Sequence, residues 1–426
     1  MTIQALYTLF QECPSISTDT RKITPNSMFF ALKGDNFNGN SFAKTALESG
    51  AKYCVIDEKE FLINEKCILV DDVLKTLQEL ANYHRKQLKT PIIALTGSNG
   101  KTTTKELIHA VLSTQFKTLA TKGNLNNHIG VPLTLLSLTR DVEIGIIEMG
   151  ANHHKEIEFL CQIALPDYGL ITNFGKAHLE GFGSIEGVIK AKSELYEHLK
   201  QHHKPIFLNI NDPVQVKQAA NYNKLVTFDT SDSNHTLKLK SAQPLLSFEY
   251  QNTTVKTHLT GAYNFNNICA AIAIGTYFKV RPEFIKQAIK NYIPTNNRSQ
   301  VIKKGTNTII LDAYNANPTS MMAALENFKQ TESNQKVLFL GDMFELGADS
   351  AIEHQNIVNY IEKHIIANVN LIGSNFFKTK TVNPLIKTFE TFEDLRSDLN
   401  SNTVNNALIL IKGSRGMALE RVLEFL

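Results

Sequence analysis

Residues 96–103 read Thr96-Gly97-Ser98-Asn99-Gly100-Lys101-Thr102-Thr103. An apolar run, residues 91–95, precedes them, and a segment of helical character, residues 104–112, follows. A strand, a glycine turn, Lys-Thr and a helix in this order are typical of a phosphate-binding loop. The general motif has glycine where this chain has Leu95, so the loop is a shorter variant. The alternative is a glycine turn that only ends a core strand, but Gly-Lys-Thr stands at the junction of strand and helix.

The residue types of this loop suit a bound phosphate chain. Gly97 and Gly100 let backbone N–H groups approach phosphate oxygens without a Cβ in the way. The N-terminus of the following helix adds unpaired N–H groups and a partial positive charge. Lys101 adds a full charge, and the hydroxyl of Thr102 is placed to reach a magnesium ion. We therefore predict a nucleotide phosphate site at residues 97–103.

The composition excludes several classes of protein. With 426 residues and 42% hydrophobic residues, the chain is long enough for two or three domains with real cores. Its 44 basic and 41 acidic residues nearly cancel, and no large basic stretch indicates a nucleic-acid partner. The first residues lack the pattern of a secretion signal. The longest apolar runs have the length of strands and fall short of the roughly 20 residues that cross a bilayer, so we expect no membrane insertion.

The five cysteines are scattered, odd in number and without a Cys-x-x-Cys pair. This argues against a disulfide framework or a zinc site and favours a reducing compartment, so we expect a cytoplasmic protein.

Three segments, 1–88, 89–294 and 295–426, are predicted from the pattern of strands and helices. The first has an apolar run at residues 28–32 and a helical pattern at 72–86, and the polar residues 84–90 are interpreted as a linker. The second alternates strands and helices. The third follows a Pro- and Asn-rich stretch and alternates four short apolar strands with helical patterns, which is typical of a doubly wound α/β unit. The predicted elements are strands at 143–147, 168–172, 308–311, 336–340, 368–372 and 407–411 and helices at 184–200 and 266–278.

Polar residues follow two of the central strands. Glu148 ends one strand, and His178 and Glu180 come in the loop after another. Open parallel sheets bind their ligands at this edge, and Mg²⁺ prefers hard oxygen ligands with few protein contacts. Glu148 suits that role when it is taken together with the phosphate loop. Alone, such a carboxylate is more often a helix cap or a surface group, and a single histidine is more often structural.

Lys192 interrupts an apolar stripe of the predicted helix 184–200. It is seven residues after Ile185 and seven before Leu199, so all three lie on the same face. A lysine there must extend its amine to solvent, pair with an acid or be chemically modified. A neutral amine in such a place can react with CO₂ to form a carbamate, which would offer oxygen ligands to a second Mg²⁺.

Three polar loops follow strands of the third segment, at residues 312–318, 341–347 and 412–416. They are expected at one carboxyl edge of the sheet, where they could bind a nucleotide from the opposite side or a second substrate. The alternative for each loop is ordinary turn chemistry.

The chain resembles the Mur ligases, ATP-dependent amide-forming enzymes that build the peptide of bacterial cell-wall precursors. The resemblance covers essentially the whole chain. It rests on residues 17–21, 29–34, 96–103, 123–132, 147–151, 172–180 and 191–194, which follow in the family's order. It implies a small α/β UDP-binding domain at 1–88, a central P-loop ATPase-type parallel sheet at 89–294 and a Rossmann-like α/β domain at 295–426.

Two stretches, residues 314–318 and 341–347, resemble the family member that adds D-alanyl-D-alanine to UDP-N-acetylmuramoyl-tripeptide. This implies that the tripeptide carboxylate attacks the γ-phosphate of ATP, and that the dipeptide amine then attacks the acyl phosphate, giving the pentapeptide, ADP and phosphate. The alternatives are a sister ligase that adds the third residue, an enzyme like folylpolyglutamate synthase, or a nucleotide-dependent binding protein without ligase activity. A monomer is expected.

The resemblance also assigns roles to individual residues. Those expected to act in catalysis are Lys101, Glu148, His178 and Lys192. Those expected to bind ATP are Gly97, Ser98, Asn99, Gly100, Lys101, Thr102, Thr103, Asn267, Arg298 and Asp312. Two Mg²⁺ ions would be served by Thr102, Glu148, His178 and Lys192 as a carbamate. Those expected near the UDP-sugar peptide or the dipeptide are Thr20, Arg21, Asn126, Asn127, Asn315 and Asn317.

The chain departs from the family pattern at three places. Thr20 replaces a more frequent serine, and Tyr263 stands where a histidine usually precedes Asn264. The triplet Asn38-Gly39-Asn40 replaces an acidic-Gly-His triplet.

Overall fold

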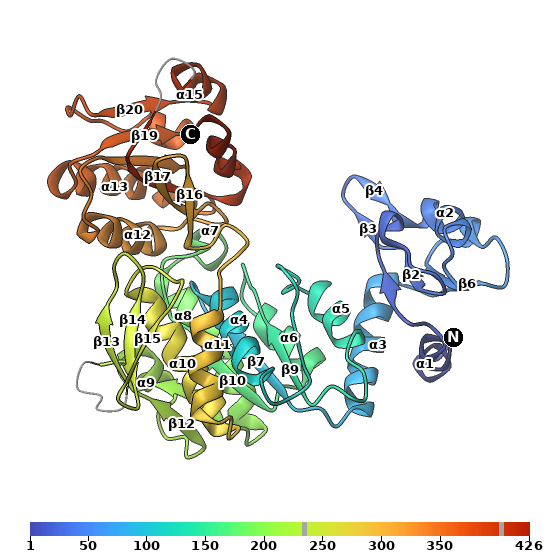
Figure 1. The fold of residues 1–426 in the computed structure, drawn as a ribbon. Helices are drawn as coiled ribbons and strands as arrows, with labels where there is room; N and C mark the ends of the chain where they lie inside the picture. Colours follow the sequence, from blue (N-terminus) through green and yellow to red (C-terminus); the bar gives the residue numbers. More distant parts are fainter. Residues whose placement is uncertain (232–236, 400–403) are drawn as a thin grey trace.

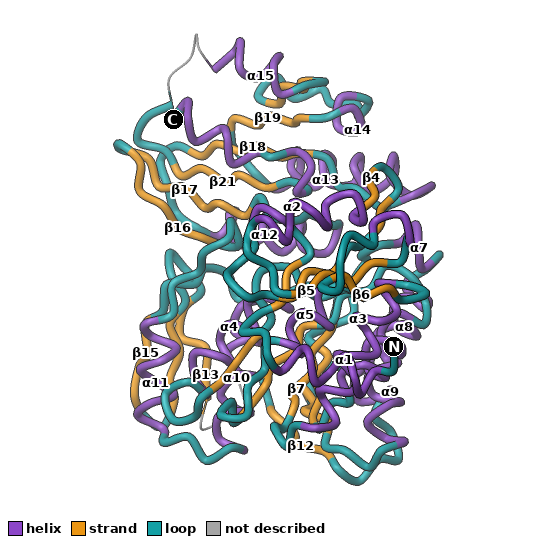
Figure 2. The backbone as a smooth tube through the Cα atoms, turned by 90° about the vertical axis from the view of Figure 1, so that its right-hand side faces the viewer, coloured by secondary structure: helices purple, strands orange, loops and turns teal. Residues whose placement is uncertain are grey.

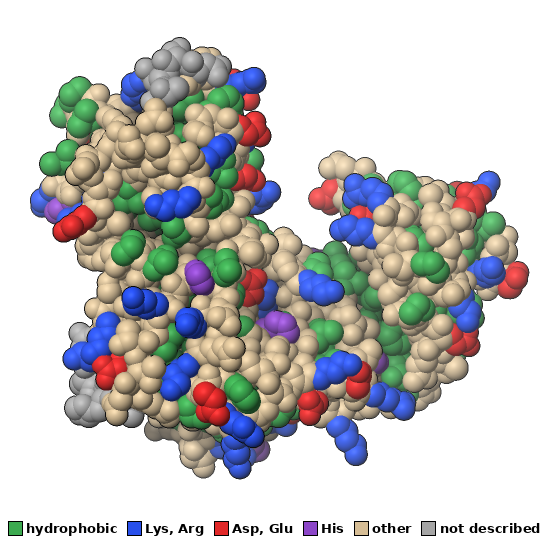
Figure 3. All heavy atoms as spheres, in the orientation of Figure 1, with side chains coloured by type: hydrophobic (Ala, Val, Ile, Leu, Met, Phe, Trp, Pro, Cys, Tyr) green, Lys and Arg blue, Asp and Glu red, His purple; other side chains and the backbone are tan. Residues whose placement is uncertain are grey.

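A computed structural model of the chain describes residues 1–231, 237–399 and 404–426. Parallel β-sheets form the centre of each of the three segments, and helices cover their faces (Figure 1). The N-terminal and C-terminal segments rise from the central segment on opposite sides and leave an open hollow between them (Figure 3). Within the described residues, no helix is both long enough and apolar enough to span a membrane.

The N-terminal segment holds a four-stranded parallel sheet of order β1-β2-β5-β6 and a small hairpin, β3-β4. Its elements are α1 (Ile3–Gln11), β1 (Ile16–Ser17), β2 (Met28–Phe30), β3 (Lys33–Gly34), β4 (Phe37–Asn38), α2 (Ala43–Glu48), β5 (Tyr53–Ile56), β6 (Cys67–Leu69) and α3 (Val73–Gln87).

Helix α3 joins this segment to the next one. Asp72 caps its N-terminus by accepting a hydrogen bond from the backbone N–H of Lys75. The helix contacts α1 on one side and α5 (Gly130–Leu136) and α6 (Glu156–Ala164) on the other. Residues 84–87, interpreted from their polarity as part of a linker, belong to this helix. His84 and Arg85 are buried. Burial is tolerated because the His84 ring bonds the carbonyl of Leu138 and the Arg85 guanidinium donates to the carbonyl of Ala164.

The central segment holds a six-stranded sheet of order β12-β11-β10-β7-β9-β8, in which every pair is parallel. An antiparallel sheet, β13-β14-β15, packs beside it and was not predicted. The further elements are β7 (Ile92–Thr96), α4 (Lys101–Leu112), β8 (Thr118–Ala120), β9 (Ile144–Glu148), β10 (Tyr168–Ile171), α7 (Leu179–Phe182), α8 (Ile185–Gln201), β11 (Ile206–Asn209), α9 (Pro213–Gln218), β12 (Leu225–Phe228), β13 (Leu237–Ser241), β14 (Ser247–Tyr250), β15 (Thr253–Lys256), α10 (Tyr263–Tyr277) and α11 (Pro282–Asn291).

The C-terminal segment holds a six-stranded sheet of order β16-β17-β21-β18-β19-β20. Only its edge strand β16 is antiparallel to its neighbour, as expected of a doubly wound unit. Figure 2 shows β16, β17, β21, β18 and β19 in this order across the segment. The four predicted strands are present, and β16 and β20 add to them. The elements are β16 (Gln300–Lys304), β17 (Asn307–Asp312), α12 (Pro318–Gln330), β18 (Lys336–Gly341), α13 (Ser350–His364), β19 (Asn368–Ile372), α14 (Ser374–Phe377), β20 (Ile386–Phe389), α15 (Phe392–Leu399) and β21 (Leu408–Lys412).

The sheet order explains why the polar loops meet. Strand β7 lies at the centre of its sheet, between β10 and β9, and Leu95 pairs with Glu148. The loops that follow β7, β9 and β10 therefore leave the same carboxyl edge. In the C-terminal segment, β21 lies between β17 and β18, which pairs Asp312 with Lys412. The two edges face each other where α12 rests on the central segment (Figure 1).

Candidate active site

The predicted phosphate loop joins β7 to α4, as its sequence order requires. Gly97 has φ +143° and Gly100 has φ +78°, values that favour glycine. A Cβ on Gly97 would lie 2.0 Å from Thr172 Oγ1, and a Cβ on Gly100 would lie 2.7 Å from Asn267 Oδ1. Both glycines are thus needed for the backbone path and for the close approach of neighbouring loops.

The loop after β10 fastens this turn. Ser98 and Gly175 exchange hydrogen bonds of 2.9 Å, and the backbone N–H of Asn99 donates to Asn173 Oδ1 at 3.0 Å. The amine of Lys101 folds back over the turn and donates to the carbonyl of Gly97 at 2.7 Å. Burial lowers the pKa of Lys101, and the nearby charge of Glu148 partly opposes that shift. The turn is therefore held rigid, with its cation beside it.

Glu148 is buried at the end of β9, next to the start of α4. Its Oε1 accepts hydrogen bonds from the hydroxyl of Thr102 at 3.2 Å and from Asn126 Nδ2 at 2.8 Å. Its Oε2 lies 3.7 Å from the amine of Lys105, one helical turn after Lys101, and finds no hydrogen-bond partner among the described residues. The sequence analysis missed Lys105.

A magnesium ion suits this place. A buried carboxylate oxygen without a hydrogen bond, next to a threonine hydroxyl, offers the hard oxygen donors that Mg²⁺ takes. In the part of the chain that the structure describes, no group of three or more His, Cys, Asp and Glu side chains is arranged to hold a metal.

His178 stands in the left-handed conformation, with φ +53°, just before α7. Its Nδ1 pairs with a carboxylate oxygen of Glu345 from the C-terminal segment, and this contact lowers the pKa of Glu345. The backbone N–H of Glu180 also donates to the carbonyl of Glu345, at 3.2 Å. In this arrangement His178 joins two segments.

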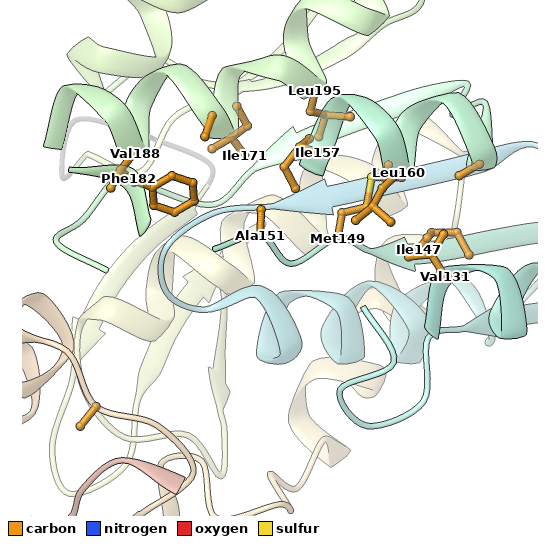
Figure 4. Packing of buried hydrophobic residues seen from close by; sticks show 14 of the residues in the cluster. Val131, Ile147, Met149, Ala151, Ile157, Leu160, Ile171, Phe182, Val188 and Leu195 are labelled. Carbon is orange, nitrogen blue, oxygen red and sulfur yellow. The ribbon is translucent and has the colours of Figure 1, made fainter. Parts of the chain in front are cut away.

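Lys192 lies on the apolar face of α8, as its spacing predicts, but it is fully buried, so its amine does not extend to solvent, which was one of the three alternatives. Its amine donates to the carbonyl of Ala151 at 3.0 Å and lies 5.1 Å from the centre of the Phe182 ring. Figure 4 shows the apolar packing of Ala151, Phe182 and Val188 in this region. Burial first, and then the charge of Lys101, holds the pKa of Lys192 well below its usual value. The neutral amine that carbamate formation requires is therefore favoured.

The C-terminal segment supplies the opposite wall. The guanidinium of Arg298 stacks 3.6 Å from the ring centre of Tyr314. Asp312 accepts hydrogen bonds from the amine of Lys412 at 2.6 Å and from the backbone N–H of Ser299 at 3.1 Å. These contacts fix a cation and a carboxylate side by side.

The two walls enclose a cleft of about 560 Å³. Most of the predicted site residues line it: Ser98, Asn99, Gly100, Lys101, Thr102, Thr103, Asn126, Asn127, Glu148, His178, Asn267, Arg298, Asp312, Asn315 and Asn317. Gly97 and Lys192 are not among the residues that line it. The lining also includes Tyr314, Lys412 and His128, which were not predicted. Tyr314 and Lys412 belong to the polar loops 312–318 and 412–416, so their place after a strand could have identified them from the sequence.

Thr20 and Arg21 are not brought to this cleft. They lie in a short 3₁₀ turn of the N-terminal segment, and Arg21 is exposed and paired with Asp19. Neither residue is among those that line the cleft.

The loop at residues 341–347 also has a different place from the other two C-terminal loops, because it does not line the cleft. Asp342 is buried and accepts hydrogen bonds from the backbone N–H groups of Asn375 and Phe376 at the start of α14. Glu345 contacts the central segment through His178. The loop thus connects two segments. Its sequence had predicted either a ligand-binding loop or an ordinary turn.

Two of the departures from the family pattern have a structural account. Asn40 is fully buried, and its amide donates to Asp57 Oδ1 at 2.8 Å while its carbonyl accepts from the backbone N–H of Asp57. Through these hydrogen bonds Asn40 fills the position that a histidine usually has in the family. The hydroxyl of Tyr263 lies 2.9 Å from Ser299 Oγ at the cleft, and burial raises its pKa. The structure does not explain Thr20.

Comparison with known proteins gives a consistent result. Three family models match the chain: Mur ligase family, catalytic domain, at residues 13–91; Mur ligase middle domain at 95–275; and Mur ligase, glutamate ligase domain, at 297–415. A UDP-N-acetylmuramoyl-tripeptide--D-alanyl-D-alanine ligase of Bacillus subtilis is 36% identical over 96% of this chain and 92% of its own length.

Two solved structures are similar over nearly their whole length. MurF from Acinetobacter baumannii superposes with a TM-score of 0.84 at 28% identity, over 99% of this chain and 98% of that one. MurF from Thermotoga maritima in complex with ADP gives a TM-score of 0.84 at 26% identity, over 98% and 97%. Family models over most of the chain and a full-length relative above 30% identity lead to one conclusion: the chain belongs to the Mur ligase family.

Proposed function

We propose that this chain is an ATP-dependent ligase that adds D-alanyl-D-alanine to UDP-N-acetylmuramoyl-tripeptide, giving the pentapeptide, ADP and phosphate. One observation carries the proposal: a rigid phosphate loop and a buried carboxylate face Arg298 and Asp312 across a single cleft. The relative from Bacillus subtilis carries this activity in its name, and the Thermotoga maritima structure holds ADP. The alternatives are a sister ligase and an enzyme like folylpolyglutamate synthase. Testing which amine substrate supports turnover separates them from the proposed activity.

The reaction needs a carboxylate to approach a triphosphate, and both are anionic. Lys101 and Arg298 lie on the two walls of the cleft and can offset that charge as the carboxylate attacks the γ-phosphate. The backbone N–H groups at the start of α4 point to the same place. Thr102 and Glu148 would hold Mg²⁺, which when bound lowers the repulsion between the anions. Amide formation then follows because an acyl phosphate, unlike a carboxylate, reacts with an amine at neutral pH.

His178 and Lys192 are proposed to serve a second Mg²⁺, with Lys192 as a carbamate. The lowered pKa of Lys192, which burial causes, supports this, and Ala151, which accepts its hydrogen bond, lines the cleft. Nδ1 of His178 is paired with Glu345, so its other ring nitrogen, Nε2, would face the metal while the carboxylate of Glu345 orients the ring.

The segments 1–88, 89–294 and 295–426 are proposed to be the working domains. The N-terminal domain would bind the UDP end of the substrate through Thr20 and Arg21, and the tripeptide would extend past Asn126 and Asn127 to the cleft. Asn315 and Asn317 would face the dipeptide. Closure of the hollow in Figure 3 would bring these parts together and exclude water from the acyl phosphate.

We further propose that the enzyme works as a monomer in the cytoplasm. All five cysteines are buried and unpaired, which agrees with a reducing compartment. Light scattering during size-exclusion chromatography tests the first part, since a dimer would give twice the mass of 47.7 kDa.

The test of function is ADP release with ATP, Mg²⁺, UDP-N-acetylmuramoyl-tripeptide and D-alanyl-D-alanine, each omitted in turn. Full turnover is expected only with all four. Replacing the dipeptide by lysine or diaminopimelate together with a UDP-N-acetylmuramoyl-dipeptide acceptor, or by glutamate together with folate, should leave background release. If one of those amines supports turnover and the dipeptide does not, a sister activity replaces the proposal. ADP release that needs neither acceptor would indicate a nucleotide-dependent binding protein.

A further inference from the structure

Helix α12 of the C-terminal segment rests on the central segment at both of its ends. At its N-terminus, the capping residue Asn317 donates from Nδ2 to Asn99 Oδ1 in the phosphate loop, at 2.8 Å. In its last turns, Asn327 donates from Nδ2 to Thr260 Oγ1 at 3.0 Å. Figure 1 shows α12 lying along the boundary, above β14 and β15. The first contact reaches the predicted ATP site directly, and the second lies away from it.

The second contact continues as a chain of buried hydrogen bonds back to the ATP site. Asn264 donates to the carbonyl of Thr260 at 2.8 Å, and Asn267 donates to Asn264 Oδ1 at 2.9 Å. The hydroxyl of Thr104, on the helix that follows the phosphate loop, donates to Asn267 Oδ1 at 3.0 Å. All of these side chains are buried, and so is Asn327. Asn267 also lies against Gly100, whose added Cβ would meet it at 2.7 Å.

This series of buried hydrogen bonds fixes α12 in one position on the central segment. Asn327 uses both ends of its carboxamide, since its Oδ1 accepts from Gln243 Nε2 at 3.1 Å while its Nδ2 reaches Thr260. Buried polar groups must keep their partners, and the geometry of these bonds tolerates little sliding. A shift of α12 would break the bonds of Asn327, and a shift of Asn267 would disturb Thr260 through Asn264.

We propose that Asn327 is a positioning residue, which docks the C-terminal segment on Thr260 and couples that docking to nucleotide binding through Asn264 and Asn267. The coupling rests on the proposed function only in taking Asn267, which lines the cleft, as part of the ATP site. The docking rests on the contacts alone. Because coupling between two events is reciprocal, a bound nucleotide strengthens the docking by the same factor by which docking strengthens nucleotide binding.

The experiment uses two variants from opposite sides of the contact, Asn327→Leu and Thr260→Val, which keep the shape and remove the hydrogen bond. The control is Asn370→Leu, because Asn370 is a buried asparagine of the same segment that bonds only the carbonyl of Leu338 in the hydrogen bonds described. Binding of a nonhydrolysable ATP analogue is measured by calorimetry. The spacing of the two segments is measured by electron spin resonance between labels at Gln201→Cys and Ile366→Cys, which are exposed, while all native cysteines are buried.

Both variants should bind the analogue about tenfold more weakly, within the usual range of such couplings, and show a broader spread of label distances without nucleotide. The double variant should be no weaker than Asn327→Leu, because Thr260→Val removes only a bond that Asn327→Leu has already removed. Asn370→Leu should match the parent. The proposal is overturned if Asn327→Leu and Thr260→Val keep both the parent's affinity and its narrow distances. If the parent itself binds no ATP analogue, the proposed function fails, while the distances still test the docking.

Discussion

Replacing Lys105 by methionine isolates the electrostatics of the predicted metal site. The Lys105 and Glu148 side chains are 3% and 1% exposed, and their charged atoms are 3.7 Å apart. Methionine keeps most of the length and apolar body of lysine and removes the charge. In that variant the Glu148 carboxylate keeps its bonds from Thr102 and Asn126 but loses the neighbouring positive charge.

The distance gives the size of the effect. Two unit charges at 3.7 Å attract by about 4.5 kcal/mol at an effective dielectric constant of about 20. Removing one partner of a buried pair usually costs about 3–5 kcal/mol, because the other charge remains buried without compensation. For a unit the size of the central segment, that loss lowers the melting temperature by roughly 6–20 °C.

Scanning calorimetry of the whole chain, with circular dichroism beside it, measures this change, since the chain has no tryptophan to report by fluorescence. Glu148→Gln alone should also destabilise, because it leaves Lys105 as the unpaired charge. The double variant Lys105→Met with Glu148→Gln should recover most of the loss. Mg²⁺ with an ATP analogue should raise the melting temperature of Lys105→Met more than that of the parent. A double variant no more stable than Lys105→Met would refute the reasoning, because charge would then not be the cause.

Four further outcomes are expected. Lys101→Ala should abolish turnover while circular dichroism shows a folded chain; parent-like rates would remove the phosphate-loop assignment. Lys192→Ala should lose activity, which formate or acetate partly restores if a carbamate is the working group; without such rescue that idea has no support. Lys192→Met should unfold at a higher temperature than the parent, because the pKa of the buried amine is lower in the folded than in the unfolded chain, and such a group destabilises the fold at any pH below its unfolded pKa. The difference in melting temperature should shrink as the pH rises from the folded towards the unfolded pKa of Lys192. A difference that stays the same over this range would exclude this cause. Gly97→Ala should prevent binding of an ATP analogue, since the added carbon would lie 2.0 Å from the hydroxyl of Thr172. A second substitution, Thr172→Ala, should restore binding only in part, because φ of residue 97 stays at +143°.

Much of the fold was predictable from the sequence because buried parallel strands carry a strong signal. The strand ending at Glu148 and the helix from Ile185 to Gln201 lie within a residue or two of their predicted bounds. By contrast, β16 (Gln300–Lys304) and β13 (Leu237–Ser241) are polar or half-exposed edge strands, and their sequence alternation is too weak to separate them from loops. Residues 84–87 were interpreted as part of a linker because they are polar, yet they belong to helix α3, where His84 and Arg85 find carbonyl partners in a neighbouring segment that local sequence does not reveal.

The residues of the cleft were predicted best where a single loop holds them. The phosphate loop has a fixed order of glycine, lysine and threonine, so its chemistry follows from local sequence. The pairing of His178 with Glu345 and the docking of Asn327 on Thr260 depend instead on how two segments meet. Contacts between segments leave no periodic pattern in either partner, and only the assembled fold shows them.

Two buried lysines illustrate the limit most clearly. Lys192 was noticed because α8 has one apolar stripe, and a charge on that stripe stands out. Lys105 is as deeply buried, but α4 is enclosed on several sides by α10, α11 and β9, so its sequence has no solvent-facing side against which a charge can be judged. Its role becomes visible only when β9 places Glu148 opposite it. Buried charges on central helices must therefore be sought by their partners in the fold, since their position in an amphipathic pattern does not show them.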